Sequence, residues 1–436
     1  MIIARAIFGI CCLVVIAWIF SVNRKKIDWK LVGAGLTVQA LIGYLILNTH
    51  WLNIFFEFFG NAFVKVIGFS SIGAQFLFGD LAKNSYSDPA TAHHLGFLFA
   101  FQVLPNIIFF STISAGLYYL GILQLVNQGI AWVMSNTMRL SGAESLSAAG
   151  NIFLGQTEAP LLIKPFIGKM SKSELLCVMT VGMSTIAGGV MAAYVSLLGG
   201  ESKEMQSSFA THLLNASIMN VPAGIVMSKI IYPETEAIET RFELVKDSLG
   251  INLLDALSKG ASDGLLLAVN VGAMLLAFIS VVAFLNYILS SVIGPLGNIN
   301  GWVFETSGGR FSVLSFEFIL GSVFRYIAIL IGIESKDCWF VGALLGQKTV
   351  INEFVAYVEL RKMIDLGQLS KHSVIVSTYA LCGFSNFSSI AIQMGSLGIL
   401  APNQKENIAL LGMKALLAAS LACLVTGALA GIFIDV

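Results

Sequence analysis

Long apolar runs dominate this sequence, and they decide what kind of fold it can adopt. The first two are Ile2–Phe20 and Leu31–Leu47, and others follow at about 95–125, 174–199, 208–232, 263–293 and 406–434. A helix needs about 20 largely apolar residues to cross a lipid bilayer. Only 11% of the 436 residues are charged, against about 25% in a typical soluble domain. The chain is therefore predicted to be an all-α integral membrane protein.

Charge balance and motif content exclude several other classes. Lys and Arg together number 25, as do Asp and Glu, so no global basic field attracts nucleic acid and no nucleic-acid partner is expected. The six cysteines show no CxxC spacing and are expected to be small buried hydrophobes. HExxH, GxSxG and P-loop motifs are all missing from the sequence, so we expect neither an enzyme nor an enzymatic cofactor.

The basic residues near the N-terminus predict how the first helix lies in the membrane. Arg24, Lys25, Lys26 and Lys30 follow Ile2–Phe20 directly, whereas a signal peptide carries its basic residues before the apolar core. This order predicts an uncleaved helix with a periplasmic N-terminus and a cytoplasmic first loop.

Two segments are too polar to be ordinary spanning helices. Trp51–Phe78 is rich in Phe but carries Glu57 and Lys65, so it is predicted to be an amphipathic helix along the membrane interface. The polar segment YPETEAIETRFELVKDSLG, which begins at Tyr232, is expected to form a surface loop with a helix.

Two further regions contain apolar segments that are too short to span a bilayer. Ser145–Gly168 and Phe311–Tyr357 each hold segments of about ten residues, interrupted by Gly, Gln, Thr and Glu. Such pairs of short segments are typical of re-entrant hairpins with polar tips.

A basic turn and an interrupted helix follow each hairpin, which indicates an internal repeat. MSKSELLCVMTVGMSTIAGGVMAAY starts at Met170 and LSKHSVIVSTYALCGFSNFSSIAIQ at Leu369, an offset of 199, and LGQ also occurs twice. Repeated broken helices point to the binding site of a transporter. We therefore predict a scaffold over 1–90 and a transport core over 91–436, with repeats at about 145–200 and 311–402. The pattern leaves open whether the repeats are parallel or inverted.

Two carboxylates are the first candidates for a binding site. Glu158 and Glu353 lie in apolar surroundings, where a mid-bilayer carboxylate costs about 2.5–3.5 kcal/mol. That cost is tolerated where the side chain lines a polar cavity and meets a ligand, although a structural acid at a helix terminus is the alternative.

The residues around these acids are mostly neutral amides and hydroxyls, which suit an uncharged polar ligand such as a nucleoside or a sugar. A strongly anionic ligand would call for a basic clamp. Phe384 and Phe387 flank Asn386 and are candidates for contact with a flat ring. Asn151, with Ser184 and Thr185 at the first break, offers the oxygen ligands that Na⁺ prefers.

Three segments resemble the signature blocks of the concentrative nucleoside transporter family. They are GQTEAPLLIKPF (Gly155–Phe166), INEFVAY (Ile351–Tyr357) and CGFSNFSSIAIQMGSLGILAP (Cys382–Pro402). The likeness covers the chain from about residue 90 to its end. It implies eight transmembrane helices, two re-entrant hairpins, an interfacial helix and a homotrimer of the shorter bacterial form.

The resemblance also implies a role for individual residues. The residues that it places at the nucleobase are Gln156, Thr157 and Glu158, with Phe384, Val190 and Leu267 at the border of the base. The residues that it places at the ribose are Glu353, Asn386 and Ser389. The residues that it places at the sodium ion are Asn151, Thr185, Ile186 and Val190.

The sequence thus predicts a Na⁺-coupled symporter that imports nucleosides such as uridine across a bacterial inner membrane. A proton-coupled nucleoside symporter and a passive channel for small polar solutes are the alternatives. The sequence ranks neither the nucleosides nor the two ions.

Overall fold

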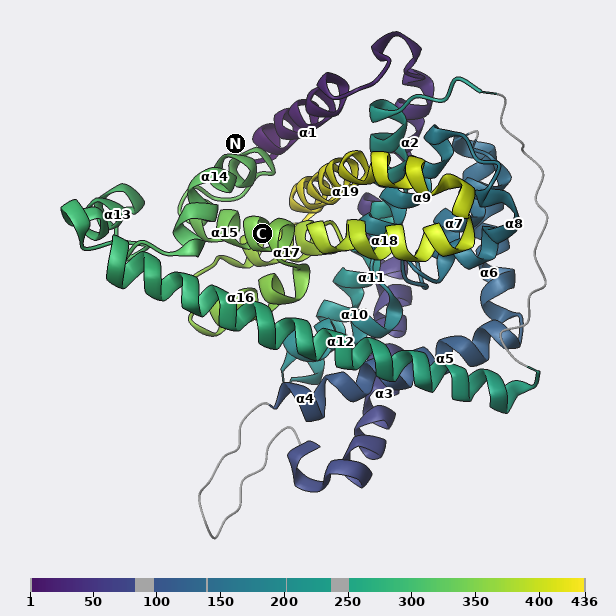
Figure 1. Ribbon diagram of the computed structural model, residues 1–436, viewed down its shortest axis with the longest axis horizontal. Helices are drawn as coiled ribbons and strands as arrows, with labels where there is room; N and C mark the ends of the chain where they lie inside the picture. Colours follow the sequence, from purple (N-terminus) through teal and green to yellow (C-terminus); the bar gives the residue numbers. More distant parts are fainter. Residues whose placement is uncertain (1, 83–97, 139, 201, 237–250, 435–436) are drawn as a thin grey trace.

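The computed structural model describes residues 2–82, 98–138, 140–200, 202–236 and 251–434, and within these ranges it contains helices and no strand (Figure 1). The predicted domain boundary near residue 90 and most of the polar segment that begins at Tyr232 lie outside the described residues. Within the described residues, seven helical segments are long and apolar enough to cross a membrane: Trp29–Asn48, Ile54–Ala82, Phe99–Tyr119, Lys172–Gly199, Lys203–Ile231, Leu253–Ile293 and Pro402–Phe433. The expected all-α membrane fold is confirmed.

The N-terminal helices begin and end where their polar residues satisfy free backbone groups. α1 (Ile2–Ile19) ends where the Arg24 guanidinium donates to the carbonyl of Ile19, at 2.7 Å. α2 (Trp29–Asn48) begins at Asp28, whose carboxylate accepts from the backbone N–H of Lys30 at 2.9 Å. Such contacts replace the backbone partners that a helix end lacks.

α3 (His50–Phe78) covers the segment predicted to lie along the membrane interface. It is one unbroken helix of 29 residues, and its segment Ile54–Ala82 qualifies as a membrane span by length and composition. Glu57 and Asn61, one turn apart, line a cavity of about 500 Å³ together with Ser207 and Thr211 of α11 (Lys203–Ile231). Two polar positions of α3 therefore line a polar cavity, whereas Lys65 is exposed outside it.

The first hairpin has two short arms. α7 (Gly142–Gly150) begins with a capping box between Ser141 and Glu144, and the chain returns through η3 (Ala159–Ile163) and α8 (Lys164–Ile167). At 1.5 Å per residue, an arm of nine residues reaches about 14 Å, roughly half of the hydrocarbon thickness. The hairpin is therefore re-entrant in length, as expected.

The second hairpin lies further along the chain than the predicted range Phe311–Tyr357. Its arms are α15 (Cys338–Val350) and α16 (Glu353–Asp365), and α14 (Phe316–Leu330) is a separate helix that packs along α15. Asn352 caps α16, because its side chain accepts from the backbone N–H of Val355 at 2.9 Å. Glu353 therefore starts the second arm, although the prediction placed it near the end of the hairpin.

The two broken helices match each other in register. α9 and α17 begin at Lys172 and Lys371, each after a serine N-cap, and their second halves α10 and α18 begin at Gly188 and Phe387. Both pairs keep the offset of 199. The helices end as α9 (Lys172–Ser184), α10 (Gly188–Gly199), α17 (Lys371–Leu381) and α18 (Phe387–Leu400). The predicted repeat is thus present as matching broken helices.

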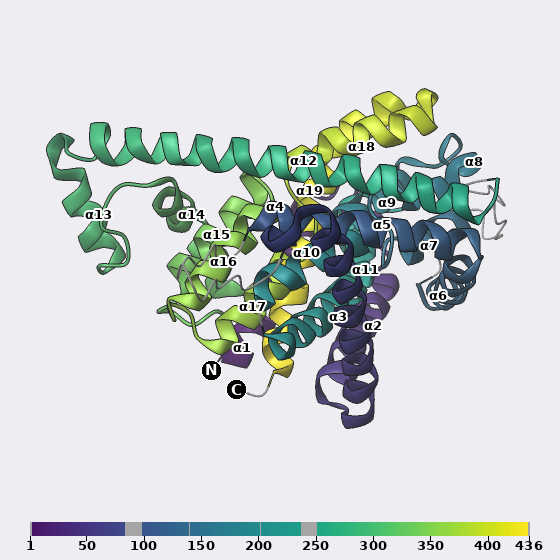
Figure 2. The same ribbon diagram turned by 90° about the horizontal axis from the view of Figure 1, so that it is seen from below.

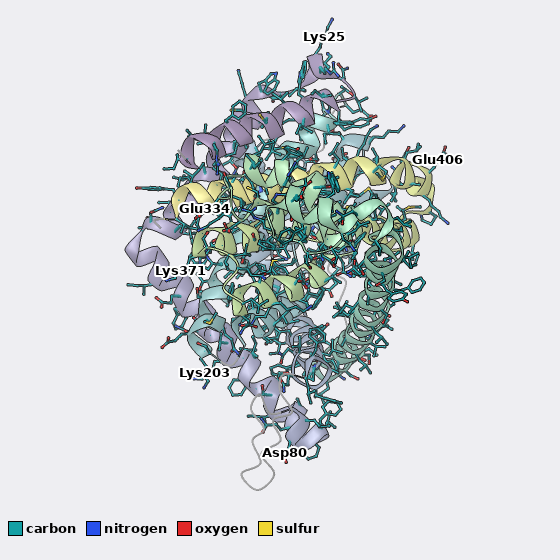
Figure 3. All side chains as sticks on the ribbon, turned by 90° about the vertical axis from the view of Figure 1, so that its left-hand side faces the viewer. Lys25, Asp80, Lys203, Glu334, Lys371 and Glu406 are labelled. Carbon is teal, nitrogen blue, oxygen red and sulfur yellow. The ribbon has the colours of Figure 1, made fainter. Side chains whose placement is uncertain are left out.

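Two long helices pack against the repeats in the interior of the molecule, and a third long helix lies outside them. α11 and α19 (Lys405–Phe433) pack against each other and against the broken helices. Of the 18-residue apolar stretch of α11 that is suited to span a membrane, 89% is buried. α12 (Leu253–Tyr287) crosses one side of the molecule over α5 (Leu104–Tyr119) (Figure 2). Of the corresponding 18-residue apolar stretch of α12, only 11% is buried. Exposed charged side chains such as Lys25, Asp80 and Glu406 lie at the periphery (Figure 3).

The remaining elements are η1 (Arg24–Lys26), η2 (Gly79–Ala82), α4 (Phe99–Gln102), α6 (Ile122–Met138), η4 (Ile288–Ile293), η5 (Leu296–Asn298), α13 (Ile299–Ser307) and η6 (Pro402–Gln404). All six cysteines are free. Four of them are buried as expected, whereas Cys12 is partly exposed and Cys11 is exposed on the apolar helix α1.

Candidate functional site

The breaks of the two repeats meet each other at the centre of the molecule. The backbone N–H of Phe384 donates to the carbonyl of Thr185 at 3.4 Å. Gly383 has φ +139°, and a Cβ there would lie 2.5 Å from the carbonyl oxygen of Ser184. Only glycine fits both the backbone conformation and this close approach. The two breaks therefore form one shared centre.

Glu353 is held between the two repeats. Its carboxylate accepts from the Tyr194 hydroxyl of α10 at 2.7 Å and from the Asn386 side-chain amide at 2.8 Å. Asn386 in turn caps α18, because its side-chain oxygen accepts from the backbone N–H of Ser389 at 2.9 Å. Glu353 is only 4% exposed, so its charge depends on these donors instead of water.

Gln156, at the tip of the first hairpin, contacts the same part of α18. Its side-chain amide donates to the Ser389 hydroxyl at 3.2 Å, and its oxygen accepts from Gln393 at 3.2 Å. Gln393 also donates to the carbonyl of Met179 in α9, at 3.0 Å. Hydrogen bonds thus lead from Tyr194 through Glu353, Asn386 and Ser389 to Gln156, and we call these five residues the polar path.

Two predicted base-side residues lie outside the polar path. Thr157 is exposed. Glu158 is half-buried, accepts from the backbone N–H of Gly155 at 3.5 Å, and lines a separate cavity of about 100 Å³ with Lys259 and Asp263 of α12. The structure therefore joins Gln156 to the predicted ribose side but leaves Thr157 and Glu158 apart from it.

The predicted apolar border residues come from three elements. Phe384 is partly buried at the second break, and Val190 is buried in the first turn of α10. Leu267 is partly buried on α12, one turn beyond Asp263 of the Glu158 cavity. No contact that the structure gives joins Leu267 to the polar path within the described residues.

The predicted sodium ligands lie at the first break and at the first hairpin. Thr185 and Ile186 are buried in the break, and Asn151 ends α7. The tip is bonded to the break, because the backbone N–H of Gly188 donates to the carbonyl of Phe153 at 3.1 Å. Among the described residues, no group of three or more His, Cys, Asp or Glu side chains forms a metal cluster.

Sequence reasoning missed four buried polar residues. Tyr194 belongs to the polar path, and Gln393 donates to its last residue, Gln156. Asn220 of α11 donates to the carbonyl of Cys382 at 2.7 Å, and Lys348 of α15 donates to the carbonyl of Ala380 at 2.9 Å. Each is a polar residue inside an apolar helix, a pattern by which they could have been found.

The base of the first hairpin is held by a buried ion pair. Lys229 of α11 contacts the Glu144 carboxylate of α7 at 2.5 Å and donates to Ser173 of α9 at 3.1 Å. Beyond the end of α11, partial burial favours a higher pKa for Glu234. The backbone N–H donors of Glu236 and Thr235, together with the Lys229 charge, outweigh this effect of burial and hold the pKa of Glu234 below its ordinary value.

Three family models together cover most of the chain. The model "Na+ dependent nucleoside transporter N-terminus" matches residues 8–81, "Nucleoside recognition" matches residues 100–201, and "Na+ dependent nucleoside transporter C-terminus" matches residues 212–431.

Related proteins and a solved structure agree with these matches. The transporter YutK of Bacillus subtilis is 42% identical over 98% of both chains. Sodium/nucleoside cotransporter 1 of Rattus norvegicus is 38% identical over 97% of this chain, which spans 63% of that protein. CNTnw in an inward-facing substrate-bound state is 36% identical, with a TM-score of 0.89 over 99% of each chain.

The chain therefore belongs to the Na⁺-dependent nucleoside transporter family, and the resemblance found in its signature blocks is confirmed. The members of this family are membrane transporters and not enzymes.

Proposed function

We propose that this protein is a Na⁺-coupled symporter that imports nucleosides such as uridine. The observation that carries the proposal is the polar path, which joins both hairpins and both broken helices through neutral donors and one carboxylate. Such a set suits the hydroxyls and base edges of an uncharged nucleoside, and it contains no Lys or Arg to bind a phosphate.

The proposed binding site has a ribose side and a base side, of which the base side extends beyond the polar path. Glu353, Asn386 and Ser389 face the ribose in this proposal, because a carboxylate and an amide are good partners for sugar hydroxyls. Gln156, Thr157 and Glu158 face the base, and Phe384, Val190 and Leu267 border it. Gln156 and Ser389 are 3.2 Å apart, so an entering nucleoside replaces their hydrogen bond with its own.

Na⁺ binds between Asn151 and the first break in this proposal. The side-chain oxygen of Asn151 is buried and has no hydrogen-bond partner, which leaves an oxygen available for a cation. The Thr185 hydroxyl and the carbonyls of Ile186 and Val190 are the other expected ligands. Because the Phe153–Gly188 bond ties the hairpin to this break, a cation there orders the tip that carries Gln156, and the two sites are reciprocally coupled.

The wider setting follows from the same proposal. Residues 1–90 form a scaffold and residues 91–436 the transport core of a multi-pass protein in a bacterial inner membrane. Three copies assemble into a homotrimer, for which the weakly buried apolar helices α3 and α12 offer contact surface. The molar mass of the detergent-solubilised protein, measured by light scattering, tests the trimer.

Transport in proteoliposomes tests the function, with Na⁺ and pH gradients imposed separately. The expected result is uridine accumulation above the outside concentration when only a Na⁺ gradient is present. Accumulation driven by a pH gradient alone would favour a proton-coupled symporter. Equilibration without accumulation under either gradient would favour a passive channel.

A further inference from the structure

Lys348 is the buried charge that the proposed site does not use. It lies one turn before the tip of the second hairpin, it is 3% exposed, and its ammonium donates to the carbonyl of Ala380 at 2.9 Å. No carboxylate lies within 4 Å of it among the described residues. A buried ammonium without a counterion is costly, so its position needs a reason.

The repeat offset identifies the matching place in the first repeat. Ala380 corresponds to Val181, and the Val181 carbonyl accepts from the hydroxyls of Thr185 at 2.9 Å and Ser184 at 3.1 Å. Thr185 is also a proposed ligand of Na⁺. The last turn of α9 is therefore satisfied by hydroxyls, next to the proposed cation.

The second repeat lacks those hydroxyls. Gly383 and Phe384 occupy the positions that correspond to Ser184 and Thr185, and neither side chain can bond the Ala380 carbonyl or ligate a cation. The Lys348 ammonium takes this place. A positive charge is favourable at the C-terminal end of a helix, where carbonyl oxygens accumulate partial negative charge.

The surroundings of Lys348 screen its charge only weakly. Its side chain lines a mainly apolar cavity of about 310 Å³, together with Leu345, Phe387 and Leu421. Apolar walls screen a charge less than water does, and Glu353 begins the other arm of the same hairpin, five residues after Lys348. A fixed positive charge thus acts on both the end of α17 and the carboxylate proposed to bind the ribose.

We infer that Lys348 is a built-in cation, which holds the second broken helix and Glu353 ready for the ribose, as Na⁺ holds the first hairpin ready for the base. Lys348 is a positioning residue, and it acts on the ribose through Glu353. Only the first repeat then needs a mobile cation, and one Na⁺ accompanies each nucleoside. This inference rests on the proposed function.

Calorimetric binding to the purified protein in lipid nanodiscs tests the inference, with Na⁺ replaced stepwise by choline at constant ionic strength. For the wild type, each tenfold reduction of limiting Na⁺ is expected to weaken uridine binding at most tenfold, the slope of one linked ion. A hundredfold weakening would reveal a second Na⁺ and overturn the inference.

Two substitutions separate the charge of Lys348 from its hydrogen bond. Lys348→Gln keeps a donor for Ala380 but loses the charge, so uridine affinity should fall at least tenfold even at saturating Na⁺. Lys348→Arg keeps the charge and should stay within threefold of the wild type. Lys362→Gln is the control, because Lys362 on the second arm of the same hairpin is exposed and paired with Glu359.

The analogue 2′,3′-dideoxyuridine distinguishes a positioning role from general damage. Because Lys348 acts through Glu353, the preference for uridine over this analogue should drop at least tenfold in Lys348→Gln, whereas a damaged fold would weaken both ligands equally. Uridine binding by Lys348→Gln at the wild-type affinity would show that the charge is unnecessary. Failure of the proposed function looks different, because the wild type itself would then bind uridine without Na⁺ dependence.

Discussion

The break between α9 and α10 spans three residues and carries the Thr185 hydroxyl, whereas the break between α17 and α18 spans five and ends in Asn386. Both breaks start from serine-capped helices in the same register. Asn386, the last residue of the second break, donates to Glu353, whereas the first break is joined to the tip of the first hairpin by the N–H of Gly188, which donates to the Phe153 carbonyl. The two broken helices thus share one backbone arrangement, and the side chains at the breaks determine what each can bind.

Replacing Glu353 with Gln is expected to have the largest effect, because it removes the carboxylate that Asn386 of the second break contacts. The new amide would face the Asn386 and Tyr194 donors with at most one acceptor, and hydrogen bonds to a charged group are worth about 1.5–3 kcal/mol each. We expect uridine uptake by proteoliposomes to fall about 100-fold or more, while the protein still elutes as the wild-type assembly. Glu359→Gln, on the outer side of the same helix, is the control and should transport normally.

Gly383→Ala introduces a side chain at the contact between the two breaks. Its Cβ would lie 2.5 Å from the Ser184 carbonyl, and its φ is +139°. Overpacking and backbone strain cost about 1–3 kcal/mol each. The expected result is a clearly lower melting temperature in detergent, together with weaker binding of both Na⁺ and uridine. Gly395→Ala on α18 meets nothing within 4 Å and should leave stability unchanged, and equal melting of both variants would contradict a tight crossing.

Thr185→Val removes the hydroxyl of the first break and leaves the second break unchanged. Loss of one neutral oxygen ligand should raise the Na⁺ concentration for half-maximal uptake by about tenfold, which corresponds to about 1.4 kcal/mol. The ranking of nucleosides should not change. Thr180→Val is a matched control, because Thr180 lies in α9, just before the break, and its buried hydroxyl has no hydrogen-bond partner. Identical Na⁺ curves for both variants would remove Thr185 from the site.

Gln156→Ala should have the smallest effect. Gln156 makes neutral hydrogen bonds to Ser389 and Gln393, and such bonds contribute about 0.5–1.5 kcal/mol each. We expect a change of about three- to tenfold in the preference among bases, measured by competition against uridine uptake. Dependence on the ribose hydroxyls should stay as in the wild type. A uniform loss across all nucleosides would assign the hairpin tip a structural role instead.

The helical spans and the broken helices could be predicted from the sequence, because both follow from local patterns of residues. Apolar length gave the spans, and the offset of 199 gave the matching broken helices to the residue. The placement of Trp51–Phe78 along the membrane interface stays a prediction, because α3 is also long and apolar enough to span a membrane and Glu57 lines a polar cavity. The second hairpin was placed too early because Asn352 acts as a cap, which only the backbone geometry reveals.

The site was harder to predict than the fold. Gln156, Glu353, Asn386 and Ser389 are polar interruptions in apolar sequence, so they were visible as candidates. Tyr194, however, lies in an apolar helix and reaches Glu353 over 159 positions of the chain. Glu158 has the sequence setting of Glu353 but lies beside α12, and no local pattern encodes that separation.

The contact between the two breaks also means that neither repeat can form the polar path alone. Each repeat contributes only part of the polar path, since Gln156 and Tyr194 come from the first and Glu353, Asn386 and Ser389 from the second. A shorter ancestor with a single copy of the repeat could have completed such a path only by pairing with another molecule. Gene duplication would then have turned an encounter between two chains into a permanent feature of one, after which each half was free to specialise.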